Sequence, residues 1–510
     1  MVLFPFLVPL LLSSFVLASS KWNGLSHGMH KVKVDSYEVQ HKATGEPLPP
    51  LDTVYYFDQL IDHDDPSLGT FQQRYWVSWD YYQPGGPILL MNAGEEDASA
   101  YIGYLTVSTI TGYLAEMLNG SVVLLEHRFF GQSNPYPDLT TESLRVLTLQ
   151  QAIDDHEYFI ENVQLPIPGG DQVGPDKAPW VLFGGSYPGA LASYTLYNKP
   201  DLFAAGYASS AVVQAISDFW GYYEPTREYM PMNCSSDVEA VIAHVDEVLD
   251  SGNATAIQAL KDNFGLGSVT ANDDFAWALA TVLQTWQDLL ESGSGTIFYE
   301  FCDALEVKDG QSAGPGGWGL DHALAAWGDY YQNSDFLVDP GVSTRTTQTI
   351  TPISGPTPIT GTGRGIGFCV TSSGSGKTAP PQGTPTLVSR FAQPERWERQ
   401  CTYFFPEVFS SPPDTSLAAA RTNQQYGGWN VSTARLVFAN GVRDPWREAT
   451  VAANASPNAG SDLQPHLIGE GFHCSDMLTA EGNVNPSVKA VQQQALQYIA
   501  QWLEDWKPSA

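Results

Sequence analysis

Residues 179–190 read Pro-Trp-Val-Leu-Phe-Gly-Gly-Ser-Tyr-Pro-Gly-Ala, and this segment is the most informative one about the fold class. The apolar run 179–183 predicts a buried strand, and residues 190–197 predict a helix directly after it. The small residues before Ser186 allow a sharp strand-to-helix turn, which would project the serine Oγ above a sheet. Pro188 stands where the motif Gly-x-Ser-x-Gly has its second glycine, but a first helical turn tolerates proline. We interpret Ser186 as a nucleophile; the alternative is a glycine-rich turn without chemistry.

Apolar runs on both sides of this turn indicate further strands of the same sheet. They lie at residues 87–92, 121–125, 206–211 and 434–440. Residues 149–163 carry apolar side chains three and four positions apart, which predicts a helix between two of these strands. Continuous apolar strands alternating with helices are typical of a parallel sheet covered on both faces. The sequence therefore predicts an α/β class, with the serine turn favouring the α/β-hydrolase fold.

The pattern changes in the middle of the chain. Runs 237–249 and 273–290 look helical, and residues 339–389 are rich in Thr, Ser, Gly and Pro. Such a long loop inside a compact domain is a solvated loop or a flap over a cleft. The strand pattern returns at 434–440, and a helix along 488–502 closes the chain. We expect residues 21–211 and 416–510 to build the hydrolase domain, with a mainly helical domain, 212–415, inserted between nucleophile and acid.

A nucleophilic serine needs a base and an orienting acid, which follow it in the chain order Ser, Asp or Glu, His. Asp444 directly follows the strand 434–440, and Pro445 keeps the backbone extended there. His466 and His473 are the histidines beyond it. His473 lies in a glycine-punctuated loop before the last helix and is the better base, whereas His466 looks like a loop or strand-entry residue. The alternatives are an Asx-turn aspartate and a surface histidine.

The transition state of acyl transfer also needs N–H donors for its oxyanion. The amide of Tyr187, directly after the nucleophile, is one expected donor. The second should come from Gly94-Glu95, after the strand 87–92, and we assign it to Glu95. No metal or organic cofactor is indicated.

The charge balance excludes several classes of partner. Lys and Arg total 24 against 56 Asp and Glu, a net charge of −32 at pH 7. A polyanion repels phosphate backbones and anionic lipids, so nucleic acid and membrane surfaces are not expected partners. Its self-repulsion falls as carboxylates protonate, which is compatible with work in acid.

The N-terminus and two residue patterns indicate export. Residues 1–20 form an uncharged apolar run ending in small residues, which predicts a cleaved secretion signal, with a membrane anchor as the alternative. Five widely spaced cysteines without a Cys-x-x-Cys pair permit at most two disulfides and leave one thiol. We therefore expect a secreted glycoprotein that is off the membrane after signal cleavage. The expected glycosylation sites are Asn119, Asn233, Asn253, Asn430 and Asn454.

Several segments together resemble one family of serine peptidases, that of lysosomal Pro-X carboxypeptidase and dipeptidyl-peptidase II, and most closely its secreted fungal prolyl endopeptidases. The segments, in family order, are 70–76, 92–95, 126–133, 184–189, 206–211, 440–446 and 471–476.

The resemblance implies an α/β-hydrolase domain interrupted by helices and a Ser186–Asp444–His473 triad. It implies cleavage of proline-containing peptides on the carboxyl side of proline, generally in acid, and we favour an endopeptidase over a carboxypeptidase. By position it places Trp446 and Met477 against the substrate's proline ring. Location is expected to be extracellular, with lysosome or vacuole as the alternative.

Two other functions remain open: a secreted carboxylic-ester hydrolase on the same fold, and an inactive hydrolase scaffold used for binding. The Ser, Asp and His in the expected order argue against an inactive scaffold. The full set of family segments argues against an esterase.

Overall fold

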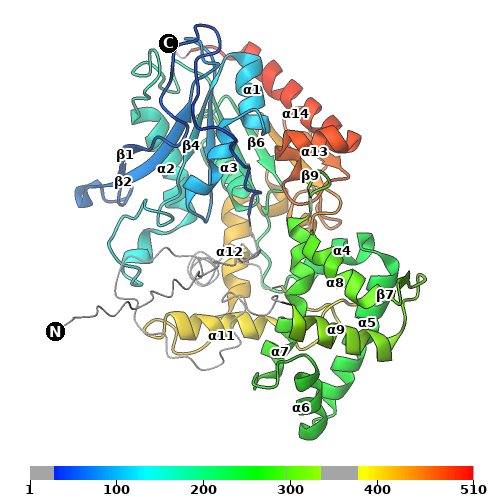
Figure 1. Cartoon of the computed structure of the whole chain (residues 1–510). Coiled ribbons are helices and arrows are strands. Elements are labelled where there is room, and N and C mark those ends of the chain that lie inside the picture. Colours follow the sequence, from blue (N-terminus) through cyan, green and yellow to red (C-terminus); the bar gives the residue numbers. More distant parts are fainter. Residues whose placement is uncertain (1–27, 294–295, 335–376, 509–510) are drawn as a thin grey trace, which may run out of the picture.

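The computed structural model describes residues 28–293, 296–334 and 377–508. The predicted signal 1–20 and most of the segment 339–389 lie outside these ranges. The described chain forms a helix-covered sheet and, beside it, a group of helices coloured green in Figure 1.

The centre of the molecule is an eight-stranded sheet in the order β1-β2-β4-β3-β5-β6-β9-β10. Its strands are β1 (Tyr55–Leu60), β2 (Thr70–Ser78), β3 (Ile88–Asn92), β4 (Ser121–Leu125), β5 (Trp180–Gly185), β6 (Ala205–Ser209), β9 (Leu436–Gly441) and β10 (His466–Gly469). From β4 to β10 all neighbours are parallel, whereas β1–β2 and β2–β4 are antiparallel. The sheet is thus mostly parallel, and the predicted hydrolase topology is confirmed.

Strands β1 and β2 are not predicted from the sequence, because polar residues interrupt their apolar pattern. Gln59 and Gln73 are fully buried and hydrogen-bonded to each other, and Arg74 is buried beside them. Buried polar groups need such partners, and the pairs exist only once the strands lie side by side.

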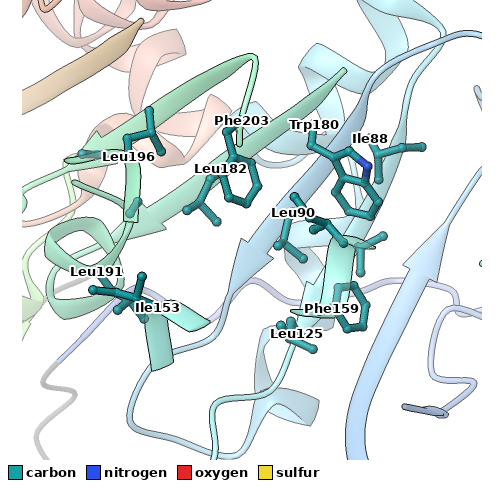
Figure 2. Close-up of a cluster of buried hydrophobic side chains, with 14 of the residues drawn as sticks. Ile88, Leu90, Leu125, Ile153, Phe159, Trp180, Leu182, Leu191, Leu196 and Phe203 are labelled. Carbon is teal, nitrogen blue, oxygen red and sulfur yellow. The ribbon is translucent and has the colours of Figure 1, made fainter. Parts of the chain in front are cut away.

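The two faces of the sheet bury different cores because side chains alternate along a strand. On β5, Trp180 and Leu182 face the cluster packed by α2 (Leu149–Asn162) and α3 (Tyr187–Asn198). Figure 2 shows this cluster, with Phe159 and Leu191 contributed by those helices. Val181 and Phe183 face the opposite cluster, covered by α1 (Ile110–Leu118) and α14 (Pro486–Asp505).

Helices from the middle of the chain form a separate core with its own aromatic interior. They are α4 (Glu224–Tyr229), α5 (Met232–Asp250), α6 (Ala254–Asn263), α7 (Asn272–Ala280), α8 (Thr296–Glu306) and α9 (Leu320–Asn333). A disulfide between Cys234 and Cys302 joins α5 to α8. The single helix predicted over 273–290 is instead α7 followed by the 3₁₀ helix η5 (Val282–Asp288). That break matters, because η5 contacts the site described below.

Two further helices, α11 (Pro394–Phe404) and α12 (Thr415–Tyr426), lead back to the sheet, and α13 (Thr479–Val484) precedes α14. Tyr426 at the end of α12 packs on Tyr194 of α3, at 4.9 Å between ring centroids. Within the described residues no helix is both long and apolar enough to span a membrane. The free cysteine of the described chain is Cys474, which is buried.

Candidate active site

Ser186 occupies a strained turn between β5 and α3. Its φ of +61° lies in a region that non-glycine residues rarely adopt. The glycines before it leave room for nothing larger, because a Cβ on Gly184 would lie 2.0 Å from the Pro188 carbonyl oxygen. Pro188 is the second residue of α3, where its missing N–H costs no helical hydrogen bond. The geometry is that of a nucleophile elbow.

Asp444 and His473 meet beside this turn. The His473 Nδ1 donates to Asp444 Oδ1 at 2.9 Å, and both side chains are fully buried. With Nδ1 carrying the proton, Nε2 presents a lone pair, and it has no hydrogen-bond partner among the described residues. Gly185 precedes Ser186, and Cys474 follows His473. A Cβ placed on Gly185 would lie 3.0 Å from the Cys474 sulfur, so these two segments are in close contact. The acid, the base and the elbow therefore converge at the carboxyl edge of the sheet.

The electrostatic surroundings of His473 come from carboxylates on both parts of the chain. Burial alone would lower the pKa of His473, but its interactions with the Asp444 carboxylate and with the neighbouring Cys474 together outweigh burial and raise the pKa well above the ordinary value. Glu95 keeps an exposed surface, yet desolvation by the protein around it raises its pKa to about 7. Desolvation likewise raises the pKa of Asp288 on η5 to about 7, and its charged form attracts a protonated His473.

The loop after β3 carries the backbone amides that we expect to bind the oxyanion. Gly94 has φ +77°, and a Cβ there would lie 2.5 Å from the Pro188 ring, so the loop presses on the elbow. The Gly94 N–H donates to the Asn92 side chain at 2.9 Å. That bond leaves the Glu95 amide as the next candidate donor. The other candidate is the Tyr187 amide, which opens α3 and has no intrahelical acceptor.

A buried chain of hydrogen bonds holds this loop. The Thr195 hydroxyl donates to a backbone carbonyl and so accepts from His156 Nδ1. His156 Nε2 then accepts from the Asn92 amide at 2.9 Å. Burial lowers the pKa of His156 to about 4, which keeps the ring neutral and able to accept. The loop geometry is thus set by residues outside the motif itself.

The Tyr187 side chain is held in a similar way. His127 Nδ1 donates to the Arg128 carbonyl, so its Nε2 accepts from the Tyr187 hydroxyl at 2.9 Å. Burial lowers the pKa of His127 to about 4. His127 follows Glu126, whose buried carboxylate accepts hydrogen bonds from the Arg74 side chain and from the Ala98 amide. The second of these bonds anchors the loop after β3.

The Trp446 side chain forms an aromatic surface beside the triad. Its indole is partly exposed, lies 6.4 Å from the His473 ring and stacks on Phe219 at 5.6 Å. Tyr222 meets it edge-on at 5.2 Å. The structure thus places Trp446 in an aromatic surface beside the base, and its contact with a substrate proline stays a prediction.

Met477 lies elsewhere. Its side chain is fully buried, and its sulfur would lie 2.6 Å from a Cβ on Gly185. It belongs to the core between the sheet and α14. This corrects the expectation of a pocket residue: the position packs beneath the elbow, and the four-residue spacing from His473 carries no information about that depth.

The other sequence candidates fall as follows. His466 opens β10 and packs its ring on Phe438 at 5.3 Å, away from Asp444, so the choice of His473 as base fits the geometry. Four of the five predicted glycosylation asparagines are exposed: Asn119, Asn253, Asn430 and Asn454. Asn233 is half-buried beside the disulfide of Cys234.

Several residues that shape the site gave no recognisable signal in the sequence. Asp288, Gln287 and Lys377 reach it from the helical part, and His30 reaches it from the N-terminal segment. His30 Nε2 donates to the backbone carbonyl of His473 at 2.9 Å. By contrast, Arg74, Asn92, Glu126 and His127 lie in the segments 70–76, 92–95 and 126–133, on which the family resemblance rests.

A mostly parallel sheet, a strained serine elbow and a buried Asp–His pair define a serine hydrolase of the α/β-hydrolase class. Comparison with known proteins narrows this. The pattern of the family described as serine carboxypeptidase S28 matches residues 59–296 and 364–495. The chain belongs to this family of serine peptidases.

Individual relatives agree with that assignment. A serine protease of Bipolaris victoriae, vicPb, is 32% identical over 88% of this chain and 89% of its own length. A probable extracellular serine carboxypeptidase of Arthroderma benhamiae is 27% identical over 88% of this chain and 66% of its own. The human thymus-specific serine protease is 28% identical over 90% of this chain and 88% of its own.

Proposed function

We propose that the protein is a secreted serine peptidase that cleaves on the carboxyl side of proline and prefers internal bonds. The observation that carries the specificity is the Trp446 indole, partly exposed beside His473 and backed by Phe219 and Tyr222. A pyrrolidine ring offers no hydrogen-bond donor, so it is recognised by shape and apolar contact. An aromatic wall next to the base supplies both.

The proposed reaction is a two-step acyl transfer. His473 Nε2 takes the Ser186 proton as Oγ attacks the prolyl carbonyl, and Asp444 holds the ring with Nδ1 protonated. The amides of Tyr187 and Glu95 stabilise the oxyanion. The C–N bond then breaks, and His473 gives its proton to the leaving amine. Water, deprotonated by the same imidazole, then attacks the acyl carbonyl. The ester C–O bond breaks, and His473 returns the proton to Ser186 Oγ.

The charges around the triad favour an endopeptidase over a carboxypeptidase. Glu95 and Asp288 lie within electrostatic reach of His473. A carboxypeptidase would bring a free C-terminal carboxylate close to the scissile bond, and at pH values above about 7, where both carboxyls are ionised, they would repel it. An internal peptide bond carries no such charge. The name of the Arthroderma relative keeps the carboxypeptidase as the second candidate.

The test uses two peptides that differ only in their termini, one blocked at both ends and one free, each with proline or alanine before the scissile bond. Turnover is followed from pH 3 to 8, with Ser186→Ala as control. Cleavage of the blocked proline peptide, absent in the mutant, is expected. Cleavage of the free-ended peptide alone would make the enzyme an exopeptidase. Serine-dependent turnover of simple esters without peptide cleavage would overturn the peptidase proposal.

Secretion rests on the apolar N-terminus, and glycosylation on the accessible sequons. Expression in a eukaryotic secretory host should yield a glycosylated protein in the medium whose N-terminus begins near residue 21. An intracellular, glycosidase-sensitive product would point to the lysosome or vacuole instead.

A further inference from the structure

Trp446 connects the triad to the helical part of the chain. Its backbone N–H donates to Asp444 Oδ1 at 2.9 Å, while its ring packs on the helical core. The indole therefore stands at the boundary between the two parts. Any group that fixes its ring from the helical side also fixes the wall of the proposed proline pocket.

Gln287 on η5 is one such group. Its Oε1 accepts from the Trp446 indole Nε1 at 2.7 Å and from the Tyr222 hydroxyl at 3.0 Å. The glutamine side chain is almost fully buried. Because one oxygen receives both donors, it sets the edge-on angle between the two rings.

Lys377 is the second group. Its ammonium lies 3.9 Å from the centre of the Tyr222 ring and 5.1 Å from that of Trp446, and it donates to Gln284 at 3.1 Å. The side chain is 7% exposed. A buried ammonium needs partners, and aromatic faces attract a cation best when water is excluded. The Lys377 ammonium therefore attracts the Tyr222 and Trp446 rings together and holds them close to each other.

The neighbouring η5 residue fixes the backbone on which this arrangement rests. Trp286 Nε1 donates to the Arg443 carbonyl at 2.7 Å, and its ring meets Phe472 at 5.2 Å. Arg443 precedes the acid, and Phe472 precedes the base. The short helix η5 is thereby tied to both catalytic loops, so Gln287 cannot shift independently of the triad.

We propose that Gln287 and Lys377 are positioning residues that hold the Trp446 indole beside the triad and so set the preference for proline over other residues. This inference rests on the proposed post-proline function. Neither residue touches the reacting atoms. Both act through the Trp446 indole, because the orientation of that ring determines how closely a substrate pyrrolidine packs against it.

The central test compares Gln287→Leu, Trp446→Phe and the double variant on matched peptides with proline or alanine before the scissile bond. Gln287→Leu removes the acceptor, and Trp446→Phe removes the indole donor. Each variant should lower the proline-to-alanine ratio of kcat/KM by about tenfold or more, mainly through KM for the proline peptide. The double variant should fall little further, because both single changes break the same bond.

The reaction of Ser186 with a small organophosphate provides a readout that does not use the pocket. Its rate should stay within about threefold of wild type in Gln287→Leu, since the triad remains assembled. Gln464→Leu is the matched control. Gln464 is similarly buried and hydrogen-bonded, but lies at the amino end of β10, so its loss should change stability and not selectivity.

Lys377→Met and Lys377→Arg test the cation. The arginine variant should keep the proline preference and the methionine variant should lose it, because only the former retains a charge over the rings. An unchanged proline-to-alanine ratio in folded Gln287→Leu and Lys377→Met would overturn the inference. Additive losses in the double variant would also do so. If wild type itself shows no preference for proline, the proposed function fails, which is a separate outcome.

Discussion

The Trp446 backbone N–H and the His473 Nδ1–H converge on one oxygen of Asp444, Oδ1. The other oxygen, Oδ2, is buried without a hydrogen-bond partner among the described residues. The acid is thus held on the side that orients the base, and the residue that forms the aromatic wall also holds the acid. Specificity and catalysis share one short turn, 444–446.

Replacing this acid should disable catalysis without unfolding the protein. Asp444→Asn keeps the size of the side chain but no longer requires the imidazole proton to sit on Nδ1. We expect kcat to fall by about 10⁴, as in other serine triads. Steady-state rates would show this, and a melting temperature near that of wild type would separate it from misfolding. A loss below tenfold would contradict the assigned role.

The carboxylate of Asp288 should influence the pH profile. Its ionised form favours protonated His473, so its removal lowers the pKa of the base. A base must be neutral to act, and the acid limb of kcat/KM in Asp288→Asn should therefore move to lower pH. Profiles measured with a small ester would show the shift. Asp309→Asn, an exposed change in the helical part, should leave the limb in place.

The oxyanion loop should not tolerate a side chain at Gly94. A methyl group there meets the Pro188 ring at 2.5 Å and also requires an unfavourable positive φ. Gly94→Ala should displace the Glu95 amide and lower kcat by about 10²–10³, the effect of losing one oxyanion donor. Gly69→Ala is the matched control, because Gly69 has φ +88° and open space around it. Equal losses of kcat in Gly94→Ala and Gly69→Ala would show that backbone strain alone causes the effect.

Stability should fall as pH rises, partly because of Glu306 on α8. Both its carboxyl oxygens are buried without hydrogen-bond partners among the described residues, and burial raises its pKa to about 7. A carboxyl with a raised folded-state pKa destabilises the fold once the unfolded chain ionises, so the loss grows from about pH 4 to pH 7. It reaches on the order of 3 kcal/mol.

Glu306→Gln should remove this loss. Denaturant unfolding at pH 7.5 should show a more stable variant, while the difference should vanish near pH 4, where both states of the wild-type carboxyl are neutral. A constant difference at the two pH values would assign the effect to packing instead.

Local patterns in the sequence predicted much of the fold. Strand 121–125 was predicted with its final bounds, and helix 149–163 to within one residue. The elbow was recognisable because its strand, glycines and helix are adjacent in the chain. Chain order selected Asp444 and His473, since acid and base follow the nucleophile in this fold.

Other parts of the fold and of the site could not be predicted from local sequence patterns, because they depend on contacts between residues that are distant in the chain. The strands 55–60 and 70–78 carry buried polar residues whose partners are distant in sequence, so no apolar period marks them. The depth of Met477 depends on how the loop 471–477 folds back onto Gly185. A spacing along the chain does not contain that distance.

The class of protein could be predicted from the sequence, because the elbow, the order of the triad and the strand–helix alternation are all local or sequential features. The residues that surround the triad became visible only in the folded chain. Asp288, Gln287 and Lys377 come to it from a separate helical core, and their charges and hydrogen bonds act over a few ångströms. These interactions depend on distances in space, and only the folded chain brings those residues within range.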